Sequence, residues 1–160
     1  MDKKFYSLGL MSGTSMDGID ASIIYSNGVD ILEVLQNKYF KYDDKFINKL
    51  SDLKNRINKS SDLKLYLSEL NNLERELTIL HAKFAGDILR DFKKDIDLVG
   101  FHGQTIYHNP DEKISKQLGD GKLLSQLIKK KIVFNFRKND IKNNGNGAPL
   151  APIYHSAITK

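Results

Sequence analysis

The sequence contains no cysteine, and it has no apolar run longer than a few residues. Without cysteine the chain forms no disulfide, no thiolate metal site and no cysteine nucleophile. The short apolar runs exclude a membrane-spanning helix, which needs roughly 20 consecutive apolar residues. The stretch Met1–Phe5 leads directly into a strand-like segment and lacks the apolar core of a secretory signal. We therefore expect a cytoplasmic protein that does not bind membranes.

Arginine is scarce among the 25 basic residues of the chain. The arginines are Arg56, Arg75, Arg90 and Arg137, and the lysines are spread along the sequence. A formal net charge of +5 is compatible with nucleic-acid binding. However, the one dense basic run, Lys129–Lys131, lies where a helix is expected to end, and cations there offset the helix dipole. We therefore expect no nucleic-acid partner.

The length and the apolar pattern predict one α/β domain with a buried core. Strands are expected at 5–12, 21–25, 29–40, 96–101 and 132–134, and helices at 43–57, 62–93 and 122–131. The first three strands should form an antiparallel meander, with a turn at Asn27–Gly28. The order βββαβαβ is typical of a ribonuclease H-like half-domain, in which helices flank a mixed sheet.

Local signals refine this prediction. Apolar residues recur three or four apart along 62–93, which marks a buried helix face, and His81 on this helix is expected to be structural. Ser60–Asp62 supplies N-cap candidates for the same helix. The segment after His102 is expected to be a loop. Regular structure should not resume before Ile153, because Pro149 and Pro152 precede it.

The stretch Leu8–Ile24 joins two apolar runs through a polar turn rich in glycine, serine, threonine and aspartate. The flexible backbone at Gly13 and Gly18 allows the amides of 13–15 to point at one anionic group. The hydroxyls of Thr14 and Ser15 add donors, and Asp17 or Asp20 could hold Mg²⁺ through water. The alternative is an ordinary hairpin turn whose polar side chains serve only local hydrogen bonds. No Walker-type P-loop occurs in the chain.

A second polar segment, Gly100–Pro110, follows the strand expected at 96–101, at the edge where ligands bind in open α/β sheets. His102 and Gln104 can exchange hydrogen bonds with hydroxyls, and Gly103 permits close approach of backbone to a sugar ring. The spacing of His102 and His108 matches no standard metal site, and no third ligand is apparent. For Asp120, at the start of the helix expected at 122–131, we favour an N-cap role over a ligand contact.

These segments together resemble the anhydro-N-acetylmuramic acid kinases, members of the sugar kinase, heat-shock protein and actin superfamily. The resemblance rests on four strings: Leu8–Ile24, Gly100–Pro110, Gln117–Asp120 and Asn135–Pro152. Met11 stands where the wider superfamily has an aspartate, and methionine there is typical of the muramic kinases. The resemblance implies ATP and Mg²⁺ as cofactors. It also implies a reaction in which water opens the anhydro ring and the freed oxygen takes the γ-phosphate, giving N-acetylmuramic acid 6-phosphate and ADP.

The resemblance also implies site residues. The residues implied for the ATP phosphates are Gly13, Thr14, Ser15, Met16, Asp17, Gly18, Ile19 and Asp20, and those implied for the sugar are His102, Gly103, Gln104, Thr105, Arg137 and Asp140. The guanidinium of Arg137 suits bidentate binding of the lactyl carboxylate of the sugar. Asp140 would orient Arg137 or a sugar hydroxyl.

Three positions depart from the family pattern: Asn135 replaces an aspartate, Asn144 a glycine and Asn146 a glutamine. The change at Asn135 could remove a partner of Arg137, and Asn144 costs backbone freedom. Drift in a gene under relaxed selection would produce the same substitutions.

The resemblance covers the whole chain but only the N-terminal lobe of the family. A second lobe carries the adenosine pocket and the catalytic base, so no base is assigned within these 160 residues. The partners to consider are a separately encoded C-terminal half and a second copy of this chain, which could cover the apolar inner face. Two alternatives stay open: a truncated remnant without turnover, and a basic ribonuclease H-like nucleic-acid-binding domain. The second lacks a carboxylate cluster, since the central strands offer mainly Asp97.

Overall fold

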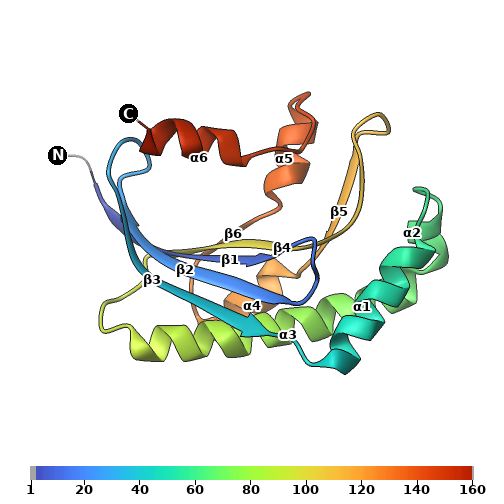
Figure 1. The fold of residues 1–160 in the computed structure, drawn as a ribbon, viewed down its shortest axis with the longest axis horizontal. Coiled ribbons are helices and arrows are strands. Elements are labelled where there is room, and N and C mark those ends of the chain that lie inside the picture. The colour runs from blue at the N-terminus through green and yellow to red at the C-terminus, as the bar shows by residue number, and fades with distance from the viewer. Residues whose placement is uncertain (1–2, 160) are drawn as a thin grey trace.

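The computed structural model describes residues 3–159 and contains one mixed sheet with helices on both faces (Figure 1). In chain order the elements are β1 (Phe5–Ser12), β2 (Gly18–Ser26), β3 (Leu32–Lys41), α1 (Asp44–Arg56), α2 (Asp62–Leu65), α3 (Leu67–Asp91), β4 (Leu98–Asn109), β5 (Ile114–Leu118), α4 (Gly121–Ile128), β6 (Ile132–Phe134), α5 (Phe136–Lys142) and α6 (Ala151–Ile158). The predicted α/β class with a mixed sheet and flanking helices is confirmed.

The sheet has the strand order β3-β2-β1-β4-β5, and β6 also pairs with β4. The expected meander is present, because β1 pairs antiparallel with β2 and β2 pairs antiparallel with β3. β4 and β6 continue the sheet in parallel. The carboxyl end of β1 therefore lies beside the middle of β4, where Ser12 pairs with Gln104, and this brings the two polar segments of the sequence together.

The two faces of the sheet differ in cover. In β1, Leu8 and Leu10 are 0% and 2% exposed, whereas Gly9 and Met11 between and after them are exposed. The buried residues belong to the core shared with α1, α3 and α4, which lie on one side of the sheet in Figure 1. On the opposite side the same figure shows α5 and α6. This second face holds the candidate site.

Several element boundaries differ from the prediction. The segment after His102 is not a loop: β4 continues to Asn109 and forms a hairpin with β5, and α5 was also missed. The long helix is interrupted at Tyr66, and α6 begins at Ala151, before Ile153, because a helix accepts proline in its first turn. Asp62 is no helix cap; its carboxylate accepts hydrogen bonds from the amides of Asn58 and Lys59.

His81 is structural, as expected, and it makes the stability of the fold pH-dependent. The ring is fully buried, Nδ1–H donates to the Leu77 carbonyl at 2.9 Å, and Nε2 has no partner within residues 3–159. Burial lowers the pKa of His81 to about 4. In the unfolded chain the histidine has its ordinary pKa near 6.5. Between the two pKa values, His81 is therefore protonated in the unfolded chain and neutral in the folded chain.

We predict that acidification from pH 7.5 to pH 5 costs about 2 kcal/mol of unfolding free energy through His81 alone. The contribution is complete above the unfolded pKa and is lost as the pH falls toward the folded pKa of about 4. Urea unfolding at both pH values would measure it. In His81→Gln, the free energy of unfolding should change less between pH 7.5 and pH 5. If it changes with pH as much as in the parent, groups other than His81 cause the dependence.

No helix among residues 3–159 combines the length and the apolar character needed to cross a bilayer.

Candidate functional site

The turn between β1 and β2 presents backbone amides at the edge of the sheet. The Met16 amide donates to the Gly13 carbonyl at 3.2 Å, and Met16 has a φ of +58°, a region that residues other than glycine seldom adopt. The Ser15 hydroxyl donates to Asp17 Oδ1 at 2.5 Å and lowers the pKa of that carboxyl. Within the described residues, the amides of Thr14 and Ser15 donate to no protein group. They are therefore available to an anion.

The remaining residues of this stretch have different surroundings. Gly18 is buried, and a Cβ there would lie 2.5 Å from the Phe40 carbonyl. Ile19 is 0% exposed and belongs to the core, so its side chain faces away from any nucleotide. Asp20 is exposed and lines a pocket with Met11 and His102. The exposed donors of the turn are thus concentrated between Gly13 and Asp17.

Three buried polar side chains hold the base of the turn. Ser12 and Gln104 are each 1% exposed, and Tyr42 is 3% exposed. The Ser12 hydroxyl accepts from the Tyr42 phenol at 3.1 Å and donates toward Gln104 Oε1 at 2.6 Å, with the Gly18 carbonyl 3.1 Å away. The Tyr42 amide donates to the Asp17 carbonyl at 2.8 Å. Both ends of the turn are therefore tied to β4 and to the start of α1.

Gln104, for which the sequence predicts a sugar contact, belongs to this network. Its Oε1 accepts from Ser12 and its Nε2 donates to the Thr105 carbonyl at 3.2 Å. The side chain is buried and both of its ends are bonded to protein, so it ties the turn to β4. Ser12 and Tyr42 were missed in the sequence because their partners lie up to 92 positions away.

Arg137, from the first turn of α5, lies against His102 of β4. Arg137 Nε donates to His102 Nε2 at 2.9 Å, and His102 Nδ1–H donates to the Gly103 carbonyl at 2.8 Å. Burial and the nearby guanidinium lower the pKa of His102, which keeps its Nε2 lone pair free to accept. Arg137 Nη1 donates to the Gly147 carbonyl at 3.2 Å. Its Nη2 has no protein acceptor among residues 3–159 and stays available to a carboxylate.

Asp140 supports Arg137 through the glycine-rich loop and does not touch it directly. Asp140 Oδ2 accepts from the Gly147 amide at 2.7 Å, while Arg137 binds the carbonyl of the same residue. The backbone of Gly147 is therefore hydrogen-bonded to both side chains. Asn144 has a φ of +67°, in the left-handed region that favours glycine, the residue that the family resemblance implies here. Asn135 also has a positive φ, of +62°, and makes no hydrogen bond to Arg137.

The other polar residues of these segments serve the scaffold. Asp120 caps α4, since its carboxylate accepts from the amides of Lys122 and Leu123, as predicted. His108 bonds to Ser115 across the hairpin, and Thr105 Oγ1 accepts from Gln117. Over residues 3–159, no three histidine, aspartate or glutamate side chains lie together as metal ligands.

The turn at residues 13–17 follows β1, and His102, which accepts a hydrogen bond from Arg137, lies on the parallel neighbour β4. The register places Met11 opposite Gly103 and Ser12 opposite Gln104. The mixed sheet opens with an antiparallel meander. Its first turn has amides without a protein acceptor in the described residues, and these lie beside polar groups of the parallel strand β4. This arrangement is that of one lobe of the actin-like phosphotransferases, a class that includes the sugar kinases.

Comparison with known proteins identifies the family within this class. The chain belongs to the anhydro-N-acetylmuramic acid kinase family, whose model matches residues 5–160. It is 54% identical over 158 residues to the anhydro-N-acetylmuramic acid kinase of Pelagibacter ubique, covering 99% of this chain and 42% of that protein. The corresponding kinases of Agrobacterium fabrum and Rhizobium etli are 37% and 38% identical, with 96% and 99% of this chain and 42% and 44% of theirs covered. The chain therefore spans less than half the length of these relatives.

Proposed function

We propose that this chain provides the N-terminal lobe of an ATP-dependent kinase for 1,6-anhydro-N-acetylmuramic acid. The reaction consumes ATP and water, opens the anhydro ring and yields N-acetylmuramic acid 6-phosphate and ADP. The observation that carries the proposal is that two sets of donors have no protein acceptor among residues 3–159: the turn amides after β1, and Arg137 Nη2 beside His102 on the neighbouring strand β4. A phosphoryl donor and an acidic sugar can bind there side by side.

In this proposal the amides of Thr14 and Ser15 bind the terminal phosphates of ATP, and the buried Ser12–Gln104–Tyr42 network keeps the turn rigid. Preorganised donors of this kind stabilise charge that develops during phosphoryl transfer. Asp17 and Asp20 offer the oxygen donors that Mg²⁺ prefers, and they would hold the ion through water. Mg²⁺ would neutralise phosphate charge. Arg137 binds the lactyl carboxylate, and Asp140 keeps the Gly147 loop against it.

The test is a fused kinase in which residues 1–160 replace the matching part of the Pelagibacter ubique relative. We expect transfer of the γ-phosphate of MgATP to the anhydro sugar, measured as ADP release and as N-acetylmuramic acid 6-phosphate, with the unaltered relative as reference. A fused protein that is folded by circular dichroism but inactive would favour a remnant without turnover.

A second measurement does not depend on the fusion. In the chain alone, MgATP should shift the NMR resonances of the Thr14 and Ser15 amides while leaving those of α3 unchanged. If MgATP does not shift the resonances of the turn amides, the proposed binding of phosphate by these amides is wrong.

A further inference from the structure

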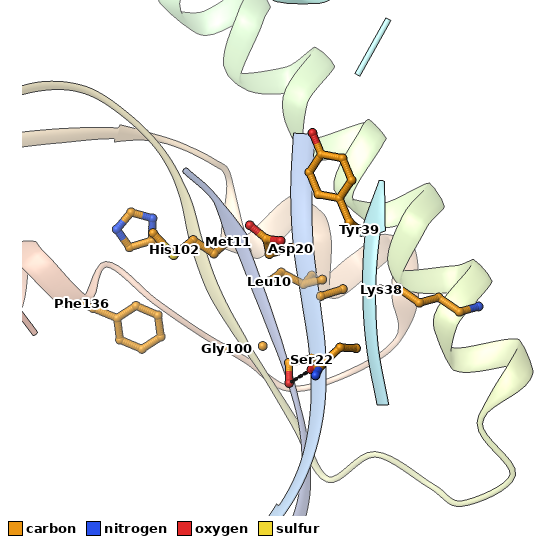
Figure 2. A pocket seen from close by; sticks show the side chains of 12 residues that line it. Leu10, Met11, Asp20, Ser22, Lys38, Tyr39, Gly100, His102 and Phe136 are labelled. Atoms are coloured by element: carbon orange, nitrogen blue, oxygen red, sulfur yellow. Dashed lines mark hydrogen bonds between the residues drawn. The ribbon is translucent and has the colours of Figure 1, made fainter. Parts of the chain in front are cut away.

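The His102 ring needs a fixed tautomer to accept from Arg137. Figure 2 shows this ring on the same side of a sheet-face pocket as Phe136, the first residue of α5. Because Arg137 Nε donates to His102 Nε2, the proton of the neutral ring has to lie on Nδ1. There it is donated to the Gly103 carbonyl at 2.8 Å. The position of the Gly103 backbone therefore decides whether Arg137 has its acceptor.

Gly103 is in direct backbone contact with the turn between β5 and α4. A Cβ at Gly103 would lie 2.1 Å from the Leu118 carbonyl oxygen and 3.6 Å from Gly119 Cα. A Cβ at Gly119 would in turn lie 3.4 Å from Gly103 Cα and 2.7 Å from the ring of Phe101. Neither glycine has a side chain that could adjust, and close packing transmits displacements. A shift of the Gly119 backbone would therefore move the Gly103 carbonyl.

Two side chains of α3 hold this turn from the opposite face of the sheet. Glu74 Oε1 accepts from the Gly119 amide at 3.2 Å and from Lys116 Nζ at 2.9 Å. One helical turn further on, the Thr78 hydroxyl accepts from the Asp120 amide at 3.0 Å and donates to the Glu74 carbonyl at 2.6 Å. Thr78 is fully buried, and the Glu74 side chain is only 24% exposed. Two consecutive amides of the turn are thus bonded to one helix.

Glu74 differs in this respect from two other acidic residues of α3. Glu69 pairs with Arg56 of α1. Glu76 pairs with Lys49 of the same helix. Among residues 3–159, these two carboxylates accept from side chains only, and they join two helices on the covered face of the sheet. Glu74 also binds a backbone amide, and that amide belongs to a segment in contact with the site.

We propose that Glu74 is a positioning residue for the His102–Arg137 pair. It holds the Gly119 backbone, which packs against Gly103. The Gly103 carbonyl then keeps His102 in the Nδ1–H tautomer, and Nε2 orients the guanidinium toward a carboxylate. The effect on sugar binding rests on the proposed function, whereas the effect on the tautomer concerns the chain alone.

The first test measures the His102 tautomer in the chain alone, from proton–nitrogen NMR correlation spectra of the imidazole ring. We expect only the Nδ1–H tautomer in the parent and a mixture of both tautomers in Glu74→Ala. Glu74→Gln should keep the parent tautomer, because both donors bind Oε1 and glutamine retains an oxygen there. Glu76→Ala is the matched control, since it also removes a lysine–glutamate pair of α3, and it should leave the tautomer unchanged.

The second test uses the fused kinase. Glu74→Ala should raise the KM for the anhydro sugar roughly tenfold and leave the KM for ATP unchanged, because a misplaced binding group weakens only the ligand that it holds. A smaller folded fraction would instead lower kcat and leave both KM values as they are. Glu74→Gln should have the sugar KM of the parent, and Glu76→Ala should change neither KM.

The outcomes separate this inference from the proposed function. A folded Glu74→Ala chain with the parent tautomer overturns the inference, and so does an active fused Glu74→Ala protein with an unchanged sugar KM. A folded fused parent without turnover contradicts the proposed function, while the tautomer measurement still decides the role of Glu74. If Glu74→Ala does not fold, Glu74→Asp replaces it, because its carboxylate is one methylene further from Gly119. The parent tautomer in that variant would also overturn the inference.

Discussion

Replacing Arg137 with alanine in the fused kinase is expected to weaken sugar binding by about 30- to 1,000-fold, equivalent to about 2–4 kcal/mol. The guanidinium is held in place by His102 Nε2 at 2.9 Å and the Gly147 carbonyl at 3.2 Å. Partial burial lowers the pKa of Arg137, but arginine stays charged. Partial desolvation also strengthens its pairing with a carboxylate. The measurement is the KM or the dissociation constant for the anhydro sugar.

Specificity for the lactyl carboxylate is tested with a second ligand, 1,6-anhydro-N-acetylglucosamine, which lacks the lactyl group. The parent protein should bind the acidic sugar more tightly, and Arg137→Ala should bind both sugars equally weakly. Arg137→Lys should restore only part of the preference, since it keeps the charge but loses the planar fork. The exposed neighbour Lys138 provides the control, because Lys138→Ala should change neither affinity. An equal loss for both sugars in Arg137→Ala would assign Arg137 a structural role only.

The largest effect on stability is expected from Gly103→Ala. Gly103 has a φ of +70°, and a Cβ at this position would lie 2.1 Å from the Leu118 carbonyl oxygen, where β4 meets β5. The left-handed conformation alone costs an alanine about 1–2 kcal/mol, and relieving the clash with backbone raises the expected total above about 3 kcal/mol. Urea unfolding of the chain at neutral pH measures this loss.

Gly86→Ala is the matched control for Gly103→Ala. Gly86 lies on the exposed side of α3, and a Cβ there meets nothing within 4 Å. Alanine should therefore raise the unfolding free energy by about 0.5–1 kcal/mol through its helix propensity. A Gly103→Ala variant as stable as the parent would contradict the predicted clash with the Leu118 carbonyl of β5.

The candidate site was only partly predictable from the sequence. The polar turn after β1 and the arginine after β6 were both identified, because their residue types and their places after predicted strands indicate ligand binding. The direction in which each side chain points was harder to predict from the sequence. The sequence did not show that Gln104 is buried and accepts a hydrogen bond from Ser12, beside the irregular pairing of β1 and β4 near Met11 and Gly103. Tyr42 gave no local signal, since its role depends on contacts with the turn 13–18.

By itself the sequence determined the elements whose signals are local. Alternating apolar residues gave the meander of β1, β2 and β3, recurring leucines gave α3, and Asp120 gave the cap of α4, because each depends on neighbours a few residues apart. The tertiary structure alone decided the β4–β5 hairpin and the contact of Arg137 with His102 across 35 positions. These features depend on which strands become neighbours in the sheet, and that choice is made by the burial of the whole core rather than by any single segment.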